Sequence, residues 1–222
     1  MKTAITQLAA LLLAAPLLHA ETRTEKPNII VILSDDVGWG DVGCYGATQI
    51  KTPHLDSLAR EGMRFTDAHA SAFVCTPTRY SLLTGEYSWR RKGSGLDRSV
   101  SNAETPLLIP LSSETFPGIL KKSGYRTGAV GKWHLGFGTR KPDYNQALTP
   151  GPLEIGFDEF FGFPATNDRV PTVYVRGHDV VGLDPADPIQ YTYEKPEKGS
   201  PMTQFSAGRN RIGWSSGGKA AW

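Results

Sequence analysis

A cysteine, a proline and an arginine stand at C-x-P-x-R spacing, as Cys75, Pro77 and Arg79. Proline suits the first turn of a helix, where its missing N–H costs nothing, so the spacing predicts a helix that begins near Cys75. The cysteine would then lie in the positive field of the helix N-terminus. Arg79, one turn later on the same face, adds a fixed positive charge. The pattern therefore predicts a site that binds an anion.

Two adjacent carboxylates, Asp35 and Asp36, follow an uninterrupted apolar run at residues 28–33. A run without polar alternation predicts a strand buried on both faces, typical of a parallel sheet covered by helices. Ligands of open α/β sheets bind at the carboxyl ends of such strands. Neighbouring carboxylates repel each other, and a divalent cation relieves the repulsion; hard oxygen ligands favour calcium, with magnesium as the alternative. Without a metal, one aspartate would cap the next turn and the other would be solvated.

A lysine and a histidine, Lys132 and His134, come at the end of a strand predicted from residue 125 onward. They alternate with Trp133, so both side chains are expected on one side of the strand. Taken alone, the pair favours a surface lysine and a packed histidine.

The three segments together resemble the sulfatase family. C-x-P-x-R resembles the sulfatase signature, residues 26–36 resemble the family's opening strand with its metal-binding aspartate pair, and residues 124–134 resemble its second signature. The three motifs stand in the family's order, and the resemblance extends over about residues 26–163. It implies a sulfuric ester hydrolase of the arylsulfatase-like kind. Its substrate would be a sulfate ester, and a sulfated carbohydrate is one candidate.

The resemblance also implies a protein-derived cofactor. In the family a maturation enzyme oxidises the signature cysteine to formylglycine, whose hydrate is the nucleophile and contacts the metal. Carried over to this sequence, Cys75 becomes formylglycine and contacts a calcium ion that Asp35 and Asp36 hold.

The remaining catalytic roles follow from the same resemblance. Arg79 and Lys132 would offset the negative charge of the sulfuryl oxygens. His134 would hydrogen-bond the second hydroxyl of the hydrated aldehyde and help to expel sulfate.

Two other functions stay open. Phosphonate and phosphodiester hydrolases of the same superfamily share the C-x-P-x-R element. A binding module or inactive remnant is the other alternative, because the family's second metal-binding pair and its further histidine and lysine come later than Trp222. The fold expected over residues 26–222 is the N-terminal part of an α/β sulfatase domain. Its mostly parallel central sheet is flanked by helices and incomplete at the C-terminal side, so the chain alone is expected to be poorly stable and inactive.

The N-terminal residues 1–20 predict a secretory signal peptide, because Lys2 precedes an apolar run that ends at Ala20. We therefore expect an exported protein, periplasmic or extracellular. The run is too short to span a membrane and is broken by Pro16. A net charge of +2 gives no indication of nucleic acid or of a membrane surface as a partner.

Export makes Cys44 and Cys75 a candidate disulfide pair, although a plain disulfide requires neither Pro77 nor Arg79. Cys44 is interpreted as a small buried residue without chemistry.

Other elements are predicted around the motifs. Helices are expected at residues 54–61 and 114–123, and strands at residues 64–69 and 156–163. The apolar residues expected on the inner faces of the two helices are Leu55, Leu58 and Ala59 in the first, and Phe116, Ile119 and Leu120 in the second. Residues 167–169 are expected either in a turn or in the substrate pocket. No helical or strand period is found in residues 208–222.

Overall fold

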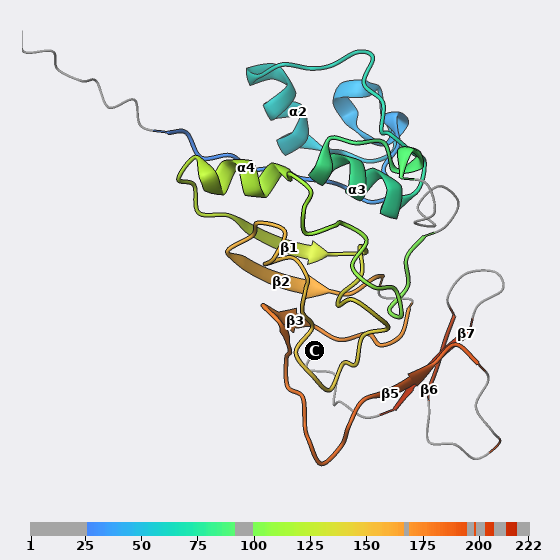
Figure 1. Cartoon of the computed structure of the whole chain (residues 1–222). Helices are drawn as coiled ribbons and strands as arrows, with labels where there is room; N and C mark the ends of the chain where they lie inside the picture. Colours follow the sequence, from blue (N-terminus) through green and yellow to red (C-terminus); the bar gives the residue numbers. More distant parts are fainter. Residues whose placement is uncertain are drawn as a thin grey trace, which may run out of the picture. The chain divides into compact units, whose positions relative to one another are not determined.

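The computed structural model describes residues 26–91, 100–166, 169–194 and 198, and the backbone of two further strands at residues 203–206 and 212–216. The chain divides into two units, Met1–Ser57 and Leu58–Trp222, which are described separately (Figure 1). The signal peptide expected at residues 1–20 lies outside the described residues.

The first unit contains two short 3₁₀ helices, η1 (Trp39–Asp41) and η2 (Gly43–Tyr45), and the start of helix α2 (Pro53–Glu61). The carboxylate of Asp56 connects two of these elements: its Oδ1 accepts a hydrogen bond from the main-chain N–H of Cys44 at 2.6 Å and from the Thr52 hydroxyl at 3.0 Å. Hydrogen bonds accepted by one carboxylate therefore hold η2 against the start of α2.

The strand predicted at residues 28–33 is wrong. These residues form no regular structure, and Ile30 and Ile32 are 81% and 78% exposed. An apolar strand is stable when neighbouring strands satisfy its backbone and both its faces are covered. None of the described strands pairs with this run, so neither condition is met.

Helix α2 confirms the helix predicted at residues 54–61, but its predicted inner face is wrong. Leu55 and Leu58 are exposed, and none of the residues of α2 is buried. Helical periodicity identifies an apolar side, whereas burial requires a surface that packs against it. Residues 64–69, expected as a strand, are irregular.

The second unit contains helix α3 (Cys75–Thr84), followed by the short 3₁₀ helix η3 (Ser88–Arg90). Pro77 is buried in the first turn of α3, and Gly85 ends the helix with a left-handed φ of 68°. The predicted helix start at Cys75 is thus confirmed.

Helix α4 (Phe116–Lys122) confirms the second predicted helix. It is capped by Thr115, whose hydroxyl oxygen accepts from the Gly118 N–H at 3.1 Å. The inward position predicted for Ile119 is wrong, since its side chain is 48% exposed. Helices α3 and α4 lie beside each other, on the same side of the strand pair that follows them in the chain (Figure 1).

The main sheet has the order β1-β2-β3-β4. Its strands are β1 (Gly128–Lys132), β2 (Glu159–Phe163), β3 (Val175–Arg176) and β4 (Asp179–Val180). Strands β1 and β2 are parallel, whereas the pairs β2–β3 and β3–β4 are antiparallel. The α/β class is therefore confirmed, but the described sheet is mixed rather than mostly parallel, because a tight turn at Gly177 reverses the chain between β3 and β4.

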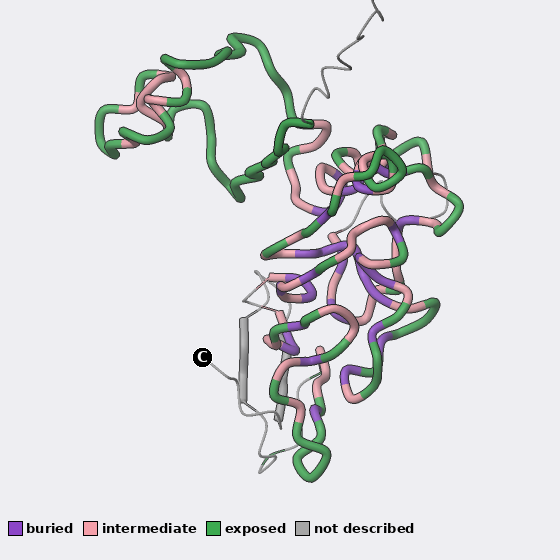
Figure 2. The backbone as a smooth tube through the Cα atoms, turned by 90° about the vertical axis from the view of Figure 1, so that its left-hand side faces the viewer, coloured by how far each residue is buried: buried purple, intermediate pink, exposed green. Residues whose placement is uncertain are grey.

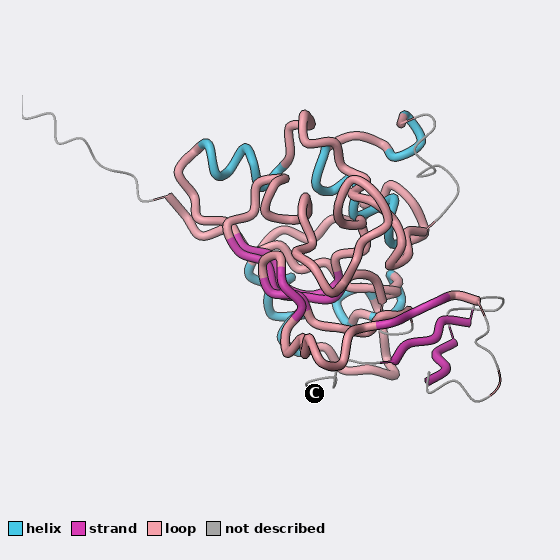
Figure 3. The backbone as a smooth tube through the Cα atoms, turned by 60° about the horizontal axis from the view of Figure 1, so that its bottom comes forward, coloured by secondary structure: helices cyan, strands magenta, loops and turns pink. Residues whose placement is uncertain are grey.

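A second, antiparallel sheet contains β5 (Gln190–Thr192), β6 (Thr203–Ser206) and β7 (Ile212–Ser216), in the order β5-β7-β6 (Figure 3). Strand β7 lies within residues 208–222, where the sequence shows no period, so that expectation is wrong for this segment. Its pairing partners come from earlier parts of the chain, and non-local pairing leaves no local pattern.

All buried residues of the described chain lie in the second unit, where Figure 2 shows them in purple. Trp133, Phe137 and Phe160 pack with ring centroids 6.0 to 6.3 Å apart. Because Trp133 directly follows β1 and precedes His134, this aromatic cluster fixes the segment that carries the second predicted motif.

Contact between β1 and β2 depends on a pair of glycines. A Cβ atom on Gly162 would lie 1.8 Å from the carbonyl oxygen of Gly131, so Gly162→Ala is expected to separate the strands and lower the free energy of unfolding by about 3 kcal/mol or more. Urea denaturation measures the loss. Gly128→Ala, in β1, is the matched control, because a Cβ there meets its nearest atom at 4.0 Å. Equal stability of the two variants would contradict the prediction.

Candidate active site

Cys75 is the first residue of α3 and is half-buried. It follows the extended residue Val74, which takes the N-cap position, so the thiol lies where unpaired N–H groups and the helix dipole favour negative charge. Neither Cys44 nor Cys75 forms a disulfide bond in the structure.

Arg79 connects α3 to the end of β1. Its Nη1 donates a hydrogen bond of 2.7 Å to the carbonyl oxygen of Lys132, which lies 53 positions later in the chain. A guanidinium has several donors in a fixed plane, so this one bond restricts the direction of the others. The Arg79 side chain thus brings together the C-x-P-x-R motif and the predicted motif at residues 124–134.

His134 is completely buried, and its backbone has a left-handed φ of 60°, which is unusual for a residue other than glycine. Its N–H donates to the carbonyl of Pro164 at 2.9 Å. Its own carbonyl oxygen accepts from two hydroxyls, Ser101 Oγ at 2.6 Å and Thr76 Oγ1 at 3.1 Å. Since Thr76 directly follows Cys75, the main chain of His134 is held against the start of α3.

The imidazole of His134 is held by a second set of contacts. Its Nε2 lies 2.7 Å from the carbonyl oxygen of Ser101, and the guanidinium of Arg169 donates to the same oxygen at 2.7 Å. None of the described residues offers a hydrogen-bond partner to the buried Nδ1. Nε2 is therefore held by the Ser101 carbonyl, whereas Nδ1 can form a hydrogen bond with another group.

The pKa of His134 is lowered to about 3, mainly because burial disfavours the charged ring and because the Lys132 ammonium repels it. Arg169 and Arg79 lower the pKa further, and the hydrogen bond with the Ser101 carbonyl raises it in part. The influence of Lys132 means that its ammonium lies close enough to the His134 ring to repel a proton there. His134 is consequently neutral at ordinary pH.

This lowered pKa predicts a pH dependence of stability. The unfolded chain takes up a proton on His134 below its ordinary pKa of 6.5, whereas the folded chain takes it up near pH 3. Stability from the neutral ring is therefore present above pH 6.5 and is lost as the pH falls, at about 1.4 kcal/mol per pH unit.

Denaturation at several pH values measures this slope. His134→Gln should remove it, and the control His54→Gln, at the exposed start of α2, should keep it. The same slope in all three proteins would contradict the assignment.

Two of the three residues predicted to contact the metal, Asp35 and Asp36, belong to the first unit, and the third, Cys75, belongs to the second. Asp35 and Asp36 are exposed, and Asp36 has a left-handed φ of 54°, a conformation that is rare outside glycine and often marks functional positions. Their carboxylates suit calcium in kind, but calcium takes about six to eight oxygen ligands. The described residues contain no group of three or more metal-ligating side chains, so the two aspartates would supply part of a ligand set.

The sequence did not single out two residues that the structure places around His134. Thr76 occupies a variable position of C-x-P-x-R, and its buried hydroxyl gives no local signal; Ser101 belongs to no motif. Arg169 was expected in a turn or in the substrate pocket, and it lies against His134, with Nη1 3.1 Å from Nε2. Asn167 and Asp168, from the same expectation, lie outside the described residues.

Comparison with known proteins decides the family. The family model described as Sulfatase matches residues 27–188. This chain is a sulfatase family member. An N-acetylgalactosamine-6-O-sulfatase of Bacteroides thetaiotaomicron is 46% identical to this sulfatase chain, over 89% of the chain and 42% of the relative. Mouse steryl-sulfatase is 42% identical, over 73% of the chain and 26% of that protein.

A solved structure supports the same fold. It comes from a study of glycosaminoglycan metabolism by Bacteroides thetaiotaomicron, and it matches with a TM-score of 0.79 and 43% identity, over 90% of this chain and 45% of that one. The sulfatase chain therefore spans less than half the length of the relatives it matches. None of its described helices has the length and apolar character to cross a membrane.

Proposed function

We propose that the protein hydrolyses sulfate esters, using residue 75 as the nucleophile after its conversion from cysteine to formylglycine. The observation that carries the proposal is the junction of α3 with the end of β1. There the residue after Cys75 bonds to His134, and Arg79 bonds to Lys132. Membership of the sulfatase family supports the same reaction.

The chain's own residues would bind and orient the sulfate group. Arg79 Nη1 bonds to the main-chain carbonyl of Lys132, so the guanidinium is placed beside the residue that carries the second cationic side chain before the substrate arrives. The neutral ring of His134 adds a hydrogen-bonding group without adding charge. Formylglycine, once formed and hydrated by one water molecule, would supply two hydroxyl groups on one carbon, which a thiol lacks.

Asp35 and Asp36 are proposed as ligands of the divalent cation that the family uses, with calcium preferred over magnesium. When bound, such a cation supplies positive charge that favours deprotonation of a nearby hydroxyl and binding of an anionic ester.

Binding of the cation tests these ligands without any turnover. Calorimetric titration with calcium is expected to show affinity at least about 10-fold lower in Asp36→Asn, because one of few charged ligands is lost. Asp67→Asn is the control: this exposed carboxylate lies beside His69, outside the proposed site. Equal calcium affinity in both variants would contradict the assignment of Asp36.

A sulfated carbohydrate is the proposed substrate class, because a relative matched over 89% of the chain is named as an N-acetylgalactosamine-6-O-sulfatase. We further propose that the protein is exported to the periplasm or beyond, as residues 1–20 predict, and that a formylglycine-forming enzyme matures it.

Parallel assays with an aryl sulfate and an aryl phosphodiester test the reaction type, using protein purified from its own host. Faster turnover of the sulfate ester is expected. Preference for the phosphodiester would favour the phosphodiester hydrolases of the superfamily. Calcium binding without turnover of either compound would favour the inactive remnant.

A further inference from the structure

A polar cluster surrounds His134 and comes from four separate segments of the second unit: its members are the buried residues Thr76, Ser101 and His134 and the half-buried Arg169. Thr76 and His134 are 0% exposed, and Ser101 is 5% exposed. Buried polar atoms nearly always have hydrogen-bond partners, and an unpaired one destabilises the fold. Nδ1 of His134 has no partner among the described residues, which points to a ligand or a modified side chain as its partner.

The two hydroxyls of the cluster hold the backbone of His134 in its left-handed conformation. Both Ser101 Oγ and Thr76 Oγ1 donate to the His134 carbonyl, and the N–H of Ser101 donates to Thr76 Oγ1 at 3.0 Å. A non-glycine residue in this conformation is strained, so it persists where its surroundings hold it. Loss of either hydroxyl should allow the ring to move.

The Ser101 carbonyl selects the tautomer of the ring. A carbonyl oxygen accepts hydrogen bonds and cannot donate them, so its 2.7 Å contact with Nε2 favours a proton on Nε2. The donor-only guanidinium of Arg169 would favour the other tautomer, but its Nη1 lies farther from Nε2, at 3.1 Å, and donates to the Ser101 carbonyl at 2.7 Å. Arg169 donates to the same oxygen, and its positive charge beside the ring opposes a second proton. Nδ1 then carries a lone pair.

We propose that three residues position the imidazole of His134: they hold it as the Nε2-protonated tautomer and leave Nδ1 to accept a hydrogen bond from the reacting group. The three positioning residues are Thr76, Ser101 and Arg169. The inference rests on the proposed sulfatase function for the identity of the reacting group, whereas the tautomer itself depends on the buried cluster alone.

Nitrogen NMR of the complete chain labelled with ¹⁵N-histidine tests the tautomer directly. Protonated and unprotonated ring nitrogens have well-separated chemical shifts, and the signals that disappear in His134→Gln assign this residue among the five histidines. We expect a protonated Nε2 and an unprotonated Nδ1 across neutral pH. A proton on Nδ1, or averaging between the two forms, would overturn the proposal.

Kinetics of host-made protein test the positioning. Thr76→Val removes the donor to the His134 carbonyl at nearly constant volume and is expected to lower kcat by about 10- to 100-fold, with a smaller change in KM. Thr76→Ser keeps the hydroxyl and should restore most of the activity. Thr78→Val is the matched control, because that hydroxyl, in the same helix, donates to the Ala72 carbonyl at 2.8 Å.

The results can contradict the positioning role and the proposed function independently of each other. Equal kcat in Thr76→Val and Thr78→Val would overturn the positioning role even if the predicted tautomer is present. Absence of sulfate ester hydrolysis in the unsubstituted protein would overturn the proposed function, and the NMR signal would then decide the tautomer without any turnover.

Discussion

Cys75→Ala is expected to lower sulfate ester hydrolysis by about 10⁴-fold or more, because alanine lacks the thiol whose oxidation would yield the proposed formylglycine nucleophile. The remaining residues would still bind the sulfate group. The variant should therefore keep affinity for inorganic sulfate while losing turnover. Initial rates with an aryl sulfate and equilibrium binding of sulfate measure the two properties separately.

Cys44→Ala is the control for this variant. Cys44 is also half-buried, and its main-chain N–H, which alanine keeps, donates a hydrogen bond to Asp56. We expect activity within about twofold of the unsubstituted protein, since substitutions away from a site usually change little. Comparable losses in the two variants would show that Cys75 acts through folding rather than as the nucleophile.

Arg79→Ala is expected to lower kcat/KM by about 10²- to 10³-fold, the usual effect of removing one positioned donor from a site of developing negative charge. Two losses combine here. The fixed positive charge disappears, and the carbonyl of Lys132 loses its 2.7 Å hydrogen bond. Arg79→Lys keeps the charge but lacks the planar donor geometry, so it should recover part of the activity.

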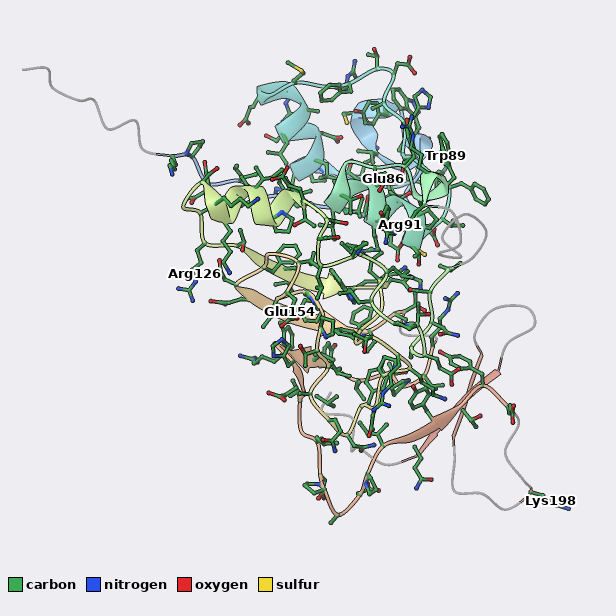
Figure 4. The ribbon with its side chains drawn as sticks, in the orientation of Figure 1. Glu86, Trp89, Arg91, Arg126, Glu154 and Lys198 are labelled. Atoms are coloured by element: carbon green, nitrogen blue, oxygen red, sulfur yellow. The ribbon has the colours of Figure 1, made fainter. Side chains whose placement is uncertain are left out.

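Arg126→Ala controls for the loss of an arginine (Arg126 is labelled in Figure 4). Its side chain is 81% exposed and pairs with Glu159 outside the candidate site, so the substitution should leave kcat/KM unchanged. If Arg126→Ala reduced activity as much as Arg79→Ala, the effect would come from net charge and not from the junction of α3 with β1.

The parts of the site that could be predicted are those with local chemical signatures. Cys75, Pro77 and Arg79 specify a helix start, and the structure begins α3 at Cys75. Lys132 ends β1 as expected from the strand before it. These predictions succeed because caps, prolines and strand ends depend on neighbouring residues.

The parts that could not be predicted depend on contacts between distant segments. Ser101 bonds to Thr76 and His134, which are 25 and 33 positions away, and no motif marks it. The left-handed backbone of His134 is likewise imposed by that surrounding cluster, since nothing in a histidine favours it.

The apolar run at residues 28–33 predicts a strand that the structure does not contain. Its composition favours a buried strand, but a strand forms through hydrogen bonds to a neighbour, and composition alone does not supply one. Leu58, on the predicted inner face of α2, is exposed for a similar reason.

Mass spectrometry of the tryptic peptide at residues 65–79, from protein made in its own host, tests the central claim most directly. This peptide contains Cys75 but not Cys44. Conversion of the thiol-bearing side chain to an aldehyde lowers the mass and makes the peptide reactive toward hydrazides. We predict that lower mass for most of the peptide; an unmodified cysteine throughout would contradict a formylglycine-dependent sulfatase.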